Sequence, residues 1–230
     1  NPLLLAGIGF VVGILGGFFG VGGGFIAGPL MFWMGVPMHF VVGTDLAHMT
    51  GKSIVAARRH RALGHVDIKL GMVMVAGTIV GVEGGARGIE ALKRVGAVDL
   101  VIGVSYVLIL LTISAFTAWE SLRALRMMST DQLDAEEAIG FQGMRRRIHG
   151  IGLPPMISLP GSGIDSISVW VVLGVGLFTG FLAATLGVGG GFVRVPMLVY
   201  VLGIPTHVAV GTDLFEIVIS AGFGTLTHAM

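Results

Sequence analysis

The sequence predicts an all-α, polytopic transmembrane protein with two repeats of inverted topology and with helices broken at glycine and proline motifs. The first observation behind this prediction is composition: 54% of the 230 residues are hydrophobic, 12% are charged, and the mean hydropathy is +0.92. A soluble domain of this size needs more polar surface. The second observation is a long motif that occurs once near each end of the chain.

The repeated motif combines glycines, prolines, a histidine and an aspartate in a fixed order. The first copy reads GVGGGF from Gly20 and GVPMHFVVGTDL from Gly35, with a proline between them. The second copy reads GVGGGF from Gly187 and GIPTHVAVGTDL from Gly203, again with a proline between them. The chain is therefore an internal duplication. Paired hydrophobic segments that are broken by glycine and proline are the best sequence indication of a transport site.

Apolar segments along the chain are expected to form the helices. They lie near residues 3–19, 25–36, 40–57, 68–86, 98–119, 167–187, 192–203 and 207–230. A helix needs about 20 residues to cross the hydrocarbon, so 25–36 and 192–203 are expected to be half-helices or strongly kinked spans. Segment 98–119 is expected to be an ordinary spanning helix.

These segments divide the chain into an N-terminal transmembrane repeat (1–119), a cytoplasmic connection (120–166) and a C-terminal transmembrane repeat (167–230). In the connection, acidic residues precede the cluster Arg145–Arg147. This order of charges is typical of a surface helix that binds anionic lipid, but it is also compatible with a solvated linker. Its proline-rich stretch 153–160 is expected to be extended. Because the chain starts with Asn and stops soon after the second motif, we expect residues to be missing at both ends and the second repeat to be incomplete.

Basic residues orient the chain in the membrane. Arg58, Arg59 and Arg61 follow the third apolar segment, and the connection carries the cluster Arg145–Arg147. Basic loops stay on the cytoplasmic side, so both regions are expected inside, with two spans between them. The second copy lacks the basic cluster that follows the first motif, and an odd number of segments separates equivalent points. Together these observations predict inverted repeats.

Composition and motifs exclude several classes of function. The chain has no cysteine, which excludes disulfides, iron–sulfur ligation and thiolate nucleophiles. It contains no GxxxxGK[ST] motif and no recognisable nucleophile–base pair, so we expect no enzyme and no cofactor. The net charge of +1 gives no indication of nucleic acid as a partner.

The two glycine motifs are the first candidate binding site. Glycines allow several backbone N–H groups to converge, and a helix that starts after them adds partial positive charge, which suits a small anion. The alternative is that the glycines only allow helices to cross closely; two matching copies favour the site. The candidates are Gly20, Gly22, Gly23, Gly24, Gly187, Gly189, Gly190 and Gly191.

The Gly-Thr-Asp-Leu sequences supply further candidates, namely Thr44, Asp45, Thr212 and Asp213. An aspartate inside apolar sequence is costly in a membrane and is usually functional. The structural alternative is that the threonine or the aspartate caps a helix that starts at this point. The two interpretations are compatible with each other.

His39, His207 and Lys52 are candidates for gating or coupling. Each histidine follows a proline at a matching place, and imidazole titrates near neutral pH. The simpler interpretation is that the histidines bond carbonyls freed at the helix breaks. Lys52 is a lone cation in apolar sequence, which could attract an anion, pair with Asp45 or reach the cytoplasmic surface.

Two other functions are compatible with parts of the sequence. His48 lies three residues after Asp45, as Glu216 does after Asp213, and with the two motif histidines these groups could ligate a divalent metal in a cation transporter. Lys52 on the same face argues against this. The other option is a non-transporting membrane subunit that anchors a larger complex.

Through the two motif copies, the chain resembles the sulfite exporter TauE/SafE family of bacterial membrane proteins, over most of its length. The resemblance implies a multi-pass transporter of small anions, chiefly sulfite, sulfonates and related compounds, in the bacterial inner membrane. The motif positions that match are Gly20, Gly22–Gly24, Pro29, Gly43, Thr44 and Asp45, with Gly187, Gly189–Gly191, Pro196, Gly211, Thr212 and Asp213.

We therefore predict the export of small oxyanions across this membrane. Backbone N–H groups of the glycine loops would bind the oxyanion, and Thr44 and Thr212 would add hydroxyl donors. Asp45 and Asp213 would organise the loops or carry coupling protons, since ionised aspartates in direct contact would repel an anion. The expected partners are a small anion and the lipid bilayer, and the sequence is compatible with either a homo-oligomer or a membrane complex.

Overall fold

The computed structural model describes residues 6–7, 9–14, 24–96, 98–128, 153–186 and 190–229. The first half contains four helices after residue 23: α2 (Gly24–Trp33), α3 (Met38–Ala62), α4 (Ile68–Val95) and α5 (Val98–Met128). The second half begins with strands β1 (Met156–Leu159) and β2 (Ile164–Ser168), joined by the short 3-10 turn η1 (Pro160–Ser162). Helix α7 (Val169–Leu186), helix α8 (Gly191–Pro196), the π-helix η2 (Met197–Val201) and α9 (Thr206–Ala229) follow.

These helices coincide with the apolar segments of the sequence, as predicted. Among the described residues, α4, α7 and the part of α9 up to Leu226 are long and apolar enough to cross a membrane. Helix α5 exposes many large apolar side chains, such as Leu100, Leu108 and Leu111, which are 71%, 59% and 62% exposed. Lipid chains cover such a surface without the cost that water imposes.

The two segments that were expected to be broken are indeed short. Helix α2 has 10 residues and is followed by Gly35, whose φ of 85° is in the left-handed region that glycine tolerates. Helix α8 has only 6 residues and continues as the π-helix η2 after Pro196. Gly203, with a φ of 76°, then ends this segment. In each copy a proline follows the turn glycine and precedes the next long helix.

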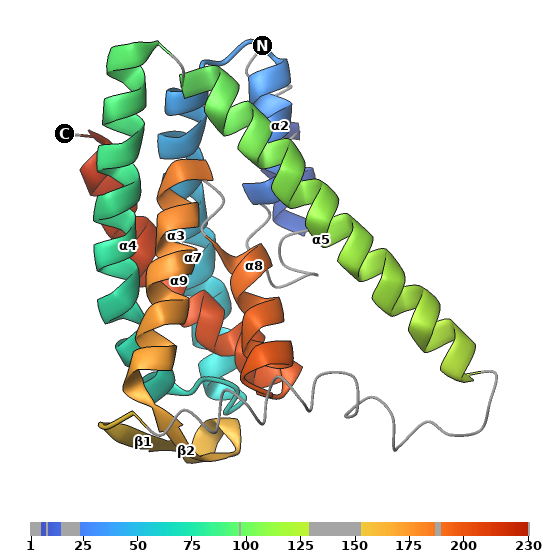
Figure 1. Ribbon diagram of the computed structural model, residues 1–230. Coiled ribbons are helices and arrows are strands. Elements are labelled where there is room, and N and C mark those ends of the chain that lie inside the picture. Colours follow the sequence, from blue (N-terminus) through green and yellow to red (C-terminus); the bar gives the residue numbers. More distant parts are fainter. Residues whose placement is uncertain are drawn as a thin grey trace.

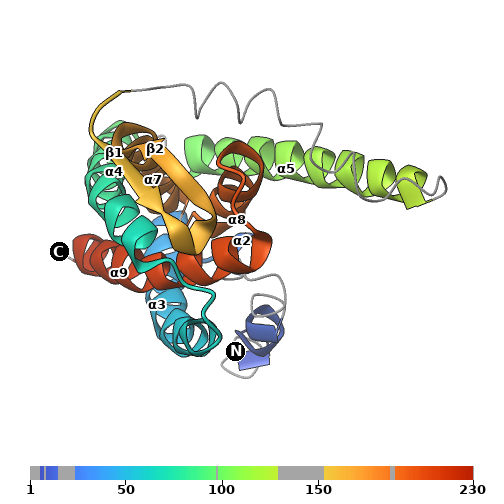
Figure 2. The same cartoon turned by 90° about the horizontal axis from the view of Figure 1, so that it is seen from below.

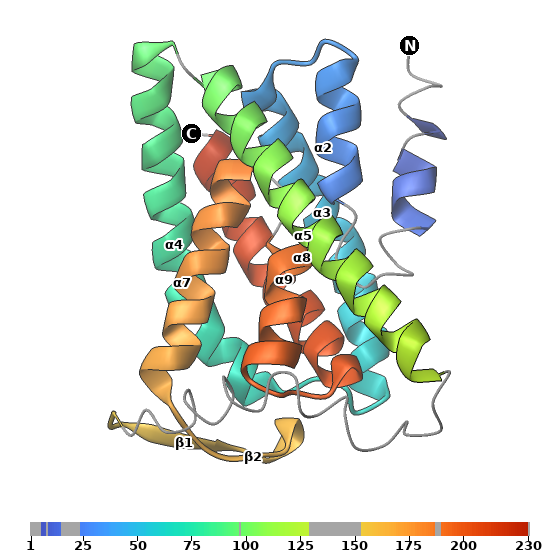
Figure 3. The ribbon, with the colours of Figure 1, turned by 45° about the vertical axis from the view of Figure 1, so that its right-hand side comes forward.

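The arrangement of the two copies is visible in Figures 1 and 3. The turn from α2 to α3 lies at the upper end of the bundle, and the turn from η2 to α9 lies at the lower end (Figure 3). Helices α3 and α9 pack against each other through Val42, Leu46 and Met49 on one side and Ile217 and Ala221 on the other. Helix α5 leans away from the bundle (Figure 1). The inverted relation of the repeats stays a prediction.

Helices α4 and α7 cross at a backbone distance that only glycine permits. A Cβ atom on Gly77 or Gly81 of α4 would overlap the carbonyl oxygens of Leu173 or Leu177 of α7. On α7, a Cβ atom on Gly176 would in turn overlap a carbonyl of α4. Small residues at such spacing are typical of tightly packed membrane helices. Close helix crossing is therefore the role of these glycines of α4 and α7, which lie outside the two repeated motifs.

A β-hairpin covers the lower end of the second half, as seen from below in Figure 2. Strands β1 and β2 are antiparallel, with Ile157 opposite Ile167. The buried side chains Leu159, Ile164 and Ile167 join the apolar core of α4, α7, η2 and α9. Part of the extended conformation expected for 153–160 is thus β1. The helix considered for the connection after residue 128 falls outside the described residues.

Candidate functional site

A cluster of charged side chains lies in the interior of the second repeat. Helix α9 starts at Thr206, so Asp213 and Glu216 point to the same side, one turn apart. Helix α8 supplies Arg194, two residues before the proline that interrupts the helix. All three side chains are 0% exposed. Charged groups at such depth are costly unless they are paired, and inside a membrane they usually mark a functional site.

One guanidinium serves both carboxylates. Nη1 of Arg194 donates to Oδ1 of Asp213 at 3.0 Å and also to Oε2 of Glu216. Nε of Arg194 donates to the hydroxyl oxygen of Thr179 on α7 at 3.0 Å. Ser220, one turn further along α9, donates to Oε2 of Glu216 at 3.1 Å. The cluster thus ties α7, α8 and α9 together.

Three atoms of this cluster have no hydrogen-bond partner among the described residues. They are Nη2 of Arg194, Oδ2 of Asp213 and Oε1 of Glu216. Nη2 lies beside the second glycine motif, because a Cβ atom on Gly190 would be 3.2 Å from it. Gly190 itself has a φ of 74° and lies against the Thr179 carbonyl, so a larger residue there is both strained and crowded. The arrangement leaves a positively charged N–H donor unused at the glycine motif.

The sequence did not lead us to Arg194, although it did draw attention to Asp213 and Glu216, the two acids that Arg194 contacts. It placed the acidic stripe of Asp213 and Glu216 on one helix and assigned no positive charge to that copy. The signal was available, because Arg194 is an arginine within an apolar segment, and the first copy has Ala27 at the same place. The positive charge of the second copy is therefore supplied by α8 and not by the stripe on α9.

The first repeat has a different polar interior. Asp45 is 1% exposed and neither of its carboxylate oxygens has a hydrogen-bond partner among the described residues. Nδ1 of His48 lies 3.8 Å from Oδ1 of Asp45, which is beyond hydrogen-bond range. The Nζ atom of Lys52 and the hydroxyl of Ser53 are also without such a partner. The positive charge near Asp45 therefore comes from its own helix, in contrast to the second repeat.

The threonines and glycines that were predicted to bind the anion differ between the two repeats in burial and contacts. Thr44 is exposed, whereas Thr212 is buried and its hydroxyl accepts a hydrogen bond from the Asp67 amide at 2.9 Å. The capping alternative is wrong, because α3 begins at Met38 and α9 at Thr206, well before these residues. Gly24 and Gly191 begin α2 and α8. The remaining motif glycines Gly20, Gly22, Gly23, Gly187 and Gly189 fall outside the described residues.

The predicted gating histidines lie in the first turns of α3 and α9. His207 is exposed, and its ring packs edge-on against His65 with 4.8 Å between the centroids. His60 continues the stack at 5.9 Å from His65. His39 is part of α3. The imidazole of His207 is therefore at the hairpin end of the bundle and makes no contact with the Arg194 cluster.

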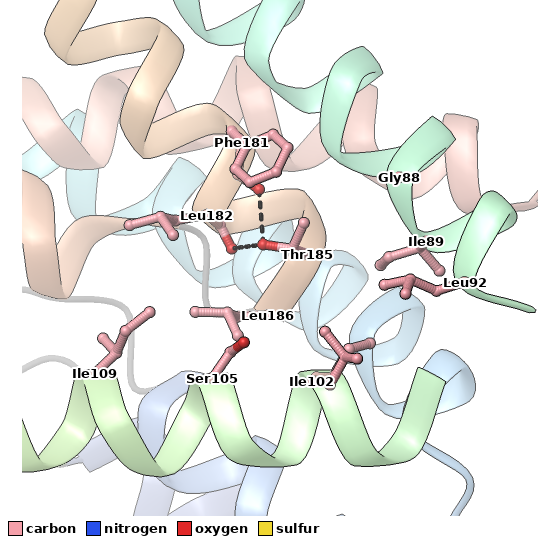
Figure 4. Close-up of a pocket in the computed structure, with 11 residues that line it drawn as sticks. Gly88, Ile89, Leu92, Ile102, Ser105, Ile109, Phe181, Leu182, Thr185 and Leu186 are labelled. Carbon is pink, nitrogen blue, oxygen red and sulfur yellow. Dashed lines mark hydrogen bonds between the residues drawn. The ribbon is translucent and has the colours of Figure 1, made fainter. Parts of the chain in front are cut away.

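Two alternative sites can be compared with this cluster. The described residues contain no group of three or more His, Asp or Glu side chains that could hold a metal ion. A cavity of about 200 Å³ lies between α4, α5 and α7 (Figure 4). Its lining is apolar except for hydroxyls, and that of Thr185 donates to the Phe181 and Leu182 carbonyls of its own helix. This cavity offers no charge to an anion.

Comparison with known proteins places the chain in a family. The family model described as sulfite exporter TauE/SafE matches residues 5–230. The chain belongs to the sulfite exporter TauE/SafE family. Membership makes it a multi-pass membrane protein of a transporter family rather than an enzyme, as the sequence analysis predicted. No solved structure matches the chain.

Individual relatives of this TauE/SafE protein are named as membrane transporters. It is 24% identical to the probable membrane transporter protein YunE of Bacillus subtilis, over 98% of the chain and 77% of the relative. It is 39% identical to a probable membrane transporter protein of Methanocaldococcus jannaschii, over 30% of the chain and 27% of the relative. YdhB of Bacillus subtilis, also a probable membrane transporter protein, is 35% identical over 34% of the chain and 32% of its own length. The chain thus spans about a third or less of the Methanocaldococcus jannaschii protein and of YdhB.

Proposed function

We propose that this protein moves small oxyanions, such as sulfite, sulfonates or related organic anions, across the bacterial inner membrane, in the direction of export. The observation that carries the proposal is Nη2 of Arg194, which has no hydrogen-bond partner among the described residues and lies beside Gly190 inside a bundle of membrane helices. The N–H groups of a guanidinium form charge-assisted hydrogen bonds to oxyanions, and the two N–H groups of Nη2 are the ones left for this purpose among the described contacts. The family membership supports the same class of substrate.

The residues have separate parts in this proposal. Arg194 binds the oxyanion through the N–H groups of Nη2, on the side of Gly190. Thr179 holds the guanidinium in place through Nε, while Asp213 and Glu216 pair with Nη1. The proposal keeps the prediction from the sequence that backbone N–H groups of the glycine loops also bind the anion. Asp45 and Lys52 form the corresponding polar interior of the first repeat.

The break between α8 and η2 suits a site that must open to either side. A π-helical segment follows Pro196, and such segments are common at functional positions in helices. The site therefore belongs to a short element, joined to long helices by turns at Gly190 and Gly203. Discontinuous helices of this kind line the substrate sites of membrane transporters.

The test is flux of ³⁵S-labelled sulfite in proteoliposomes with two matched arginine variants. Arg194→Lys keeps the positive charge but removes the planar guanidinium and its N–H groups, and we expect a rate of sulfite flux that is at least tenfold lower. Arg87→Lys alters an arginine that pairs with Glu83 on the surface of α4, and we expect the wild-type rate. Equal reconstitution of both variants is checked by protein recovery in the vesicles. Unchanged flux in Arg194→Lys contradicts the proposal.

A further inference from the structure

The charge balance of the buried cluster has a consequence for how an anion binds there. When all three groups are ionised, Arg194, Asp213 and Glu216 carry a net charge of −1. Thr179 and Ser220 complete the contacts but are neutral. A net charge in the membrane interior is costly, so the cluster is stable only if one carboxyl group holds a proton.

The structure provides places for protons on the carboxyl groups. Within this cluster, Oδ2 of Asp213 and Oε1 of Glu216 are the carboxylate oxygens without a hydrogen-bond partner among the described residues. A proton on either atom leaves the bonds from Arg194 and Ser220 intact, because those bonds use the other oxygens. Two protons can therefore be held without breaking the cluster.

Among the described residues, no ion pair other than those with Arg194 reaches these two carboxyl groups. Helix α7 carries no charged residue, and η2 carries none either. Helix α3, which packs on α9, carries Asp45, His48 and Lys52 in its middle and His39, Arg58, Arg59, His60 and Arg61 near its ends. Helix α4 carries Lys69, Glu83, Arg87, Glu90, Lys93 and Arg94, and Asp67 caps its start. Ion pairs among these residues are local to α3 or α4, and none of them reaches Asp213 or Glu216. In the described part of the chain, Arg194 is thus the positive charge that contacts both carboxyl groups directly.

We propose that the Arg194–Asp213–Glu216 cluster takes up one proton for each monovalent oxyanion that it binds. The inference rests on the proposed function, since it needs an anion at Nη2 of Arg194. The empty site is neutral with one proton; the bound anion adds one negative charge, and a second proton from water restores neutrality. The proton moves to the free oxygen of the remaining carboxylate, and no covalent bond to the substrate changes. Transport of a monoanion by this site is then electroneutral, and the proton and the anion cross the membrane in the same direction, so that export follows the concentration gradient of the anion.

The test is isothermal titration calorimetry of the full chain in lipid nanodiscs with methanesulfonate, in two buffers of different ionisation enthalpy. Methanesulfonate stays a monoanion at all pH values used, so it contributes no protons itself. We expect uptake of about one proton per anion, with an affinity that rises about tenfold for each unit by which the pH is lowered. The sign follows from linkage, because a reaction that consumes protons is favoured when protons are abundant.

Paired variants locate the proton. Asp213→Asn/Glu216→Gln keeps the shape of the site and removes both acids, so we expect binding that is independent of pH and without proton uptake. Asp165→Asn/Glu83→Gln removes two exposed acids and should retain the wild-type uptake. The wild-type pH dependence remains informative if the cluster variant does not fold.

The outcomes separate the two proposals. Binding of methanesulfonate without proton uptake by the wild-type protein overturns the coupling but leaves oxyanion binding in place. Uptake that persists in Asp213→Asn/Glu216→Gln also overturns it, because the proton then goes elsewhere. Absence of binding by sulfite and by methanesulfonate, in protein that remains folded, contradicts the proposed function itself.

Discussion

At the scale of single residues, Arg194 determines the chemistry of the interior. It is 0% exposed, and its bonds to α7 and α9 use Nε and Nη1 while Nη2 stays available. The first repeat has Ala27 at the equivalent position and places a lysine, Lys52, on the long helix instead. The duplicated halves have thus kept their glycines and aspartates but differ in which element supplies the cation.

Removal of Arg194 should destabilise the fold more than removal of its partners does. In Arg194→Gln, Asp213 and Glu216 lose the ion pair that they make among the described residues, and breaking a buried pair on one side costs about 3–5 kcal/mol. Adding Asp213→Asn and Glu216→Gln should recover much of that loss. The measurement is the free energy of unfolding in detergent micelles. A triple variant that is no more stable than Arg194→Gln would show that the carboxylates are not balanced by Arg194.

The sequence allowed one part of this site to be predicted and not the other. Asp213 was a candidate because an acid within apolar sequence is unusual on its own. Arg194 is equally unusual, but its role depends on how α8 lies against α9, which no local pattern contains. Thr212 was predicted to donate to the anion, but in the folded chain its hydroxyl accepts a hydrogen bond from the backbone N–H of Asp67 at the start of α4.

At the scale of elements, the helices and their breaks follow from apolar length, glycine and proline. The turn glycines Gly35 and Gly203 both adopt positive φ, as a break before proline requires. The abundance of glycine is typical of closely packed membrane helices, but it does not indicate which helices meet, so the crossing of α4 with α7 could not be predicted. The β-hairpin was seen only as an extended stretch, since its pairing depends on the core that it covers.

Two glycine substitutions on α4 should show whether stability depends on the close contact with α7 or on any loss of glycine from the helix. Gly81→Ala puts a methyl group against the Leu177 carbonyl on α7, and overpacking of this kind costs about 1–3 kcal/mol. Gly88→Ala lies on the same helix with no atom within 4 Å of the added group, so it should be neutral or slightly stabilising. Thermal unfolding in detergent measures both. Equal melting temperatures for the two variants would contradict the tight crossing.

At the scale of the whole molecule, helix length and the position of the basic residues indicate how the chain lies in the membrane. Helix α4 has 28 residues, which corresponds to about 42 Å at about 1.5 Å per residue, enough to cross the hydrocarbon. The basic residues just before α4 favour the cytoplasm for the lower end of the bundle. The opposite placement of the two broken segments in Figure 3 agrees with inverted repeats, a relation that remains a prediction.

Topology can be tested directly because the chain has no cysteine. Single cysteines at Leu63 and Val95, which are 52% and 79% exposed, mark the two ends of α4. A membrane-impermeant maleimide should label Leu63→Cys from the cytoplasmic side and Val95→Cys from the other side. Leu153→Cys, before the hairpin, should behave like Leu63→Cys. Labelling of the first two positions from the same side would rule out the proposed crossing of α4.

The central claim is that an oxyanion binds at Arg194, and selenite offers the most direct measurement. Selenite has the shape and charge of sulfite, and selenium scatters anomalously, so a crystal soaked with it locates the anion without reference to transport. The account predicts an anomalous peak within hydrogen-bond distance of Nη2 of Arg194, beside Gly190, and loss of that peak in Arg194→Lys. A selenite peak elsewhere in the bundle, unaffected by Arg194→Lys, would contradict it.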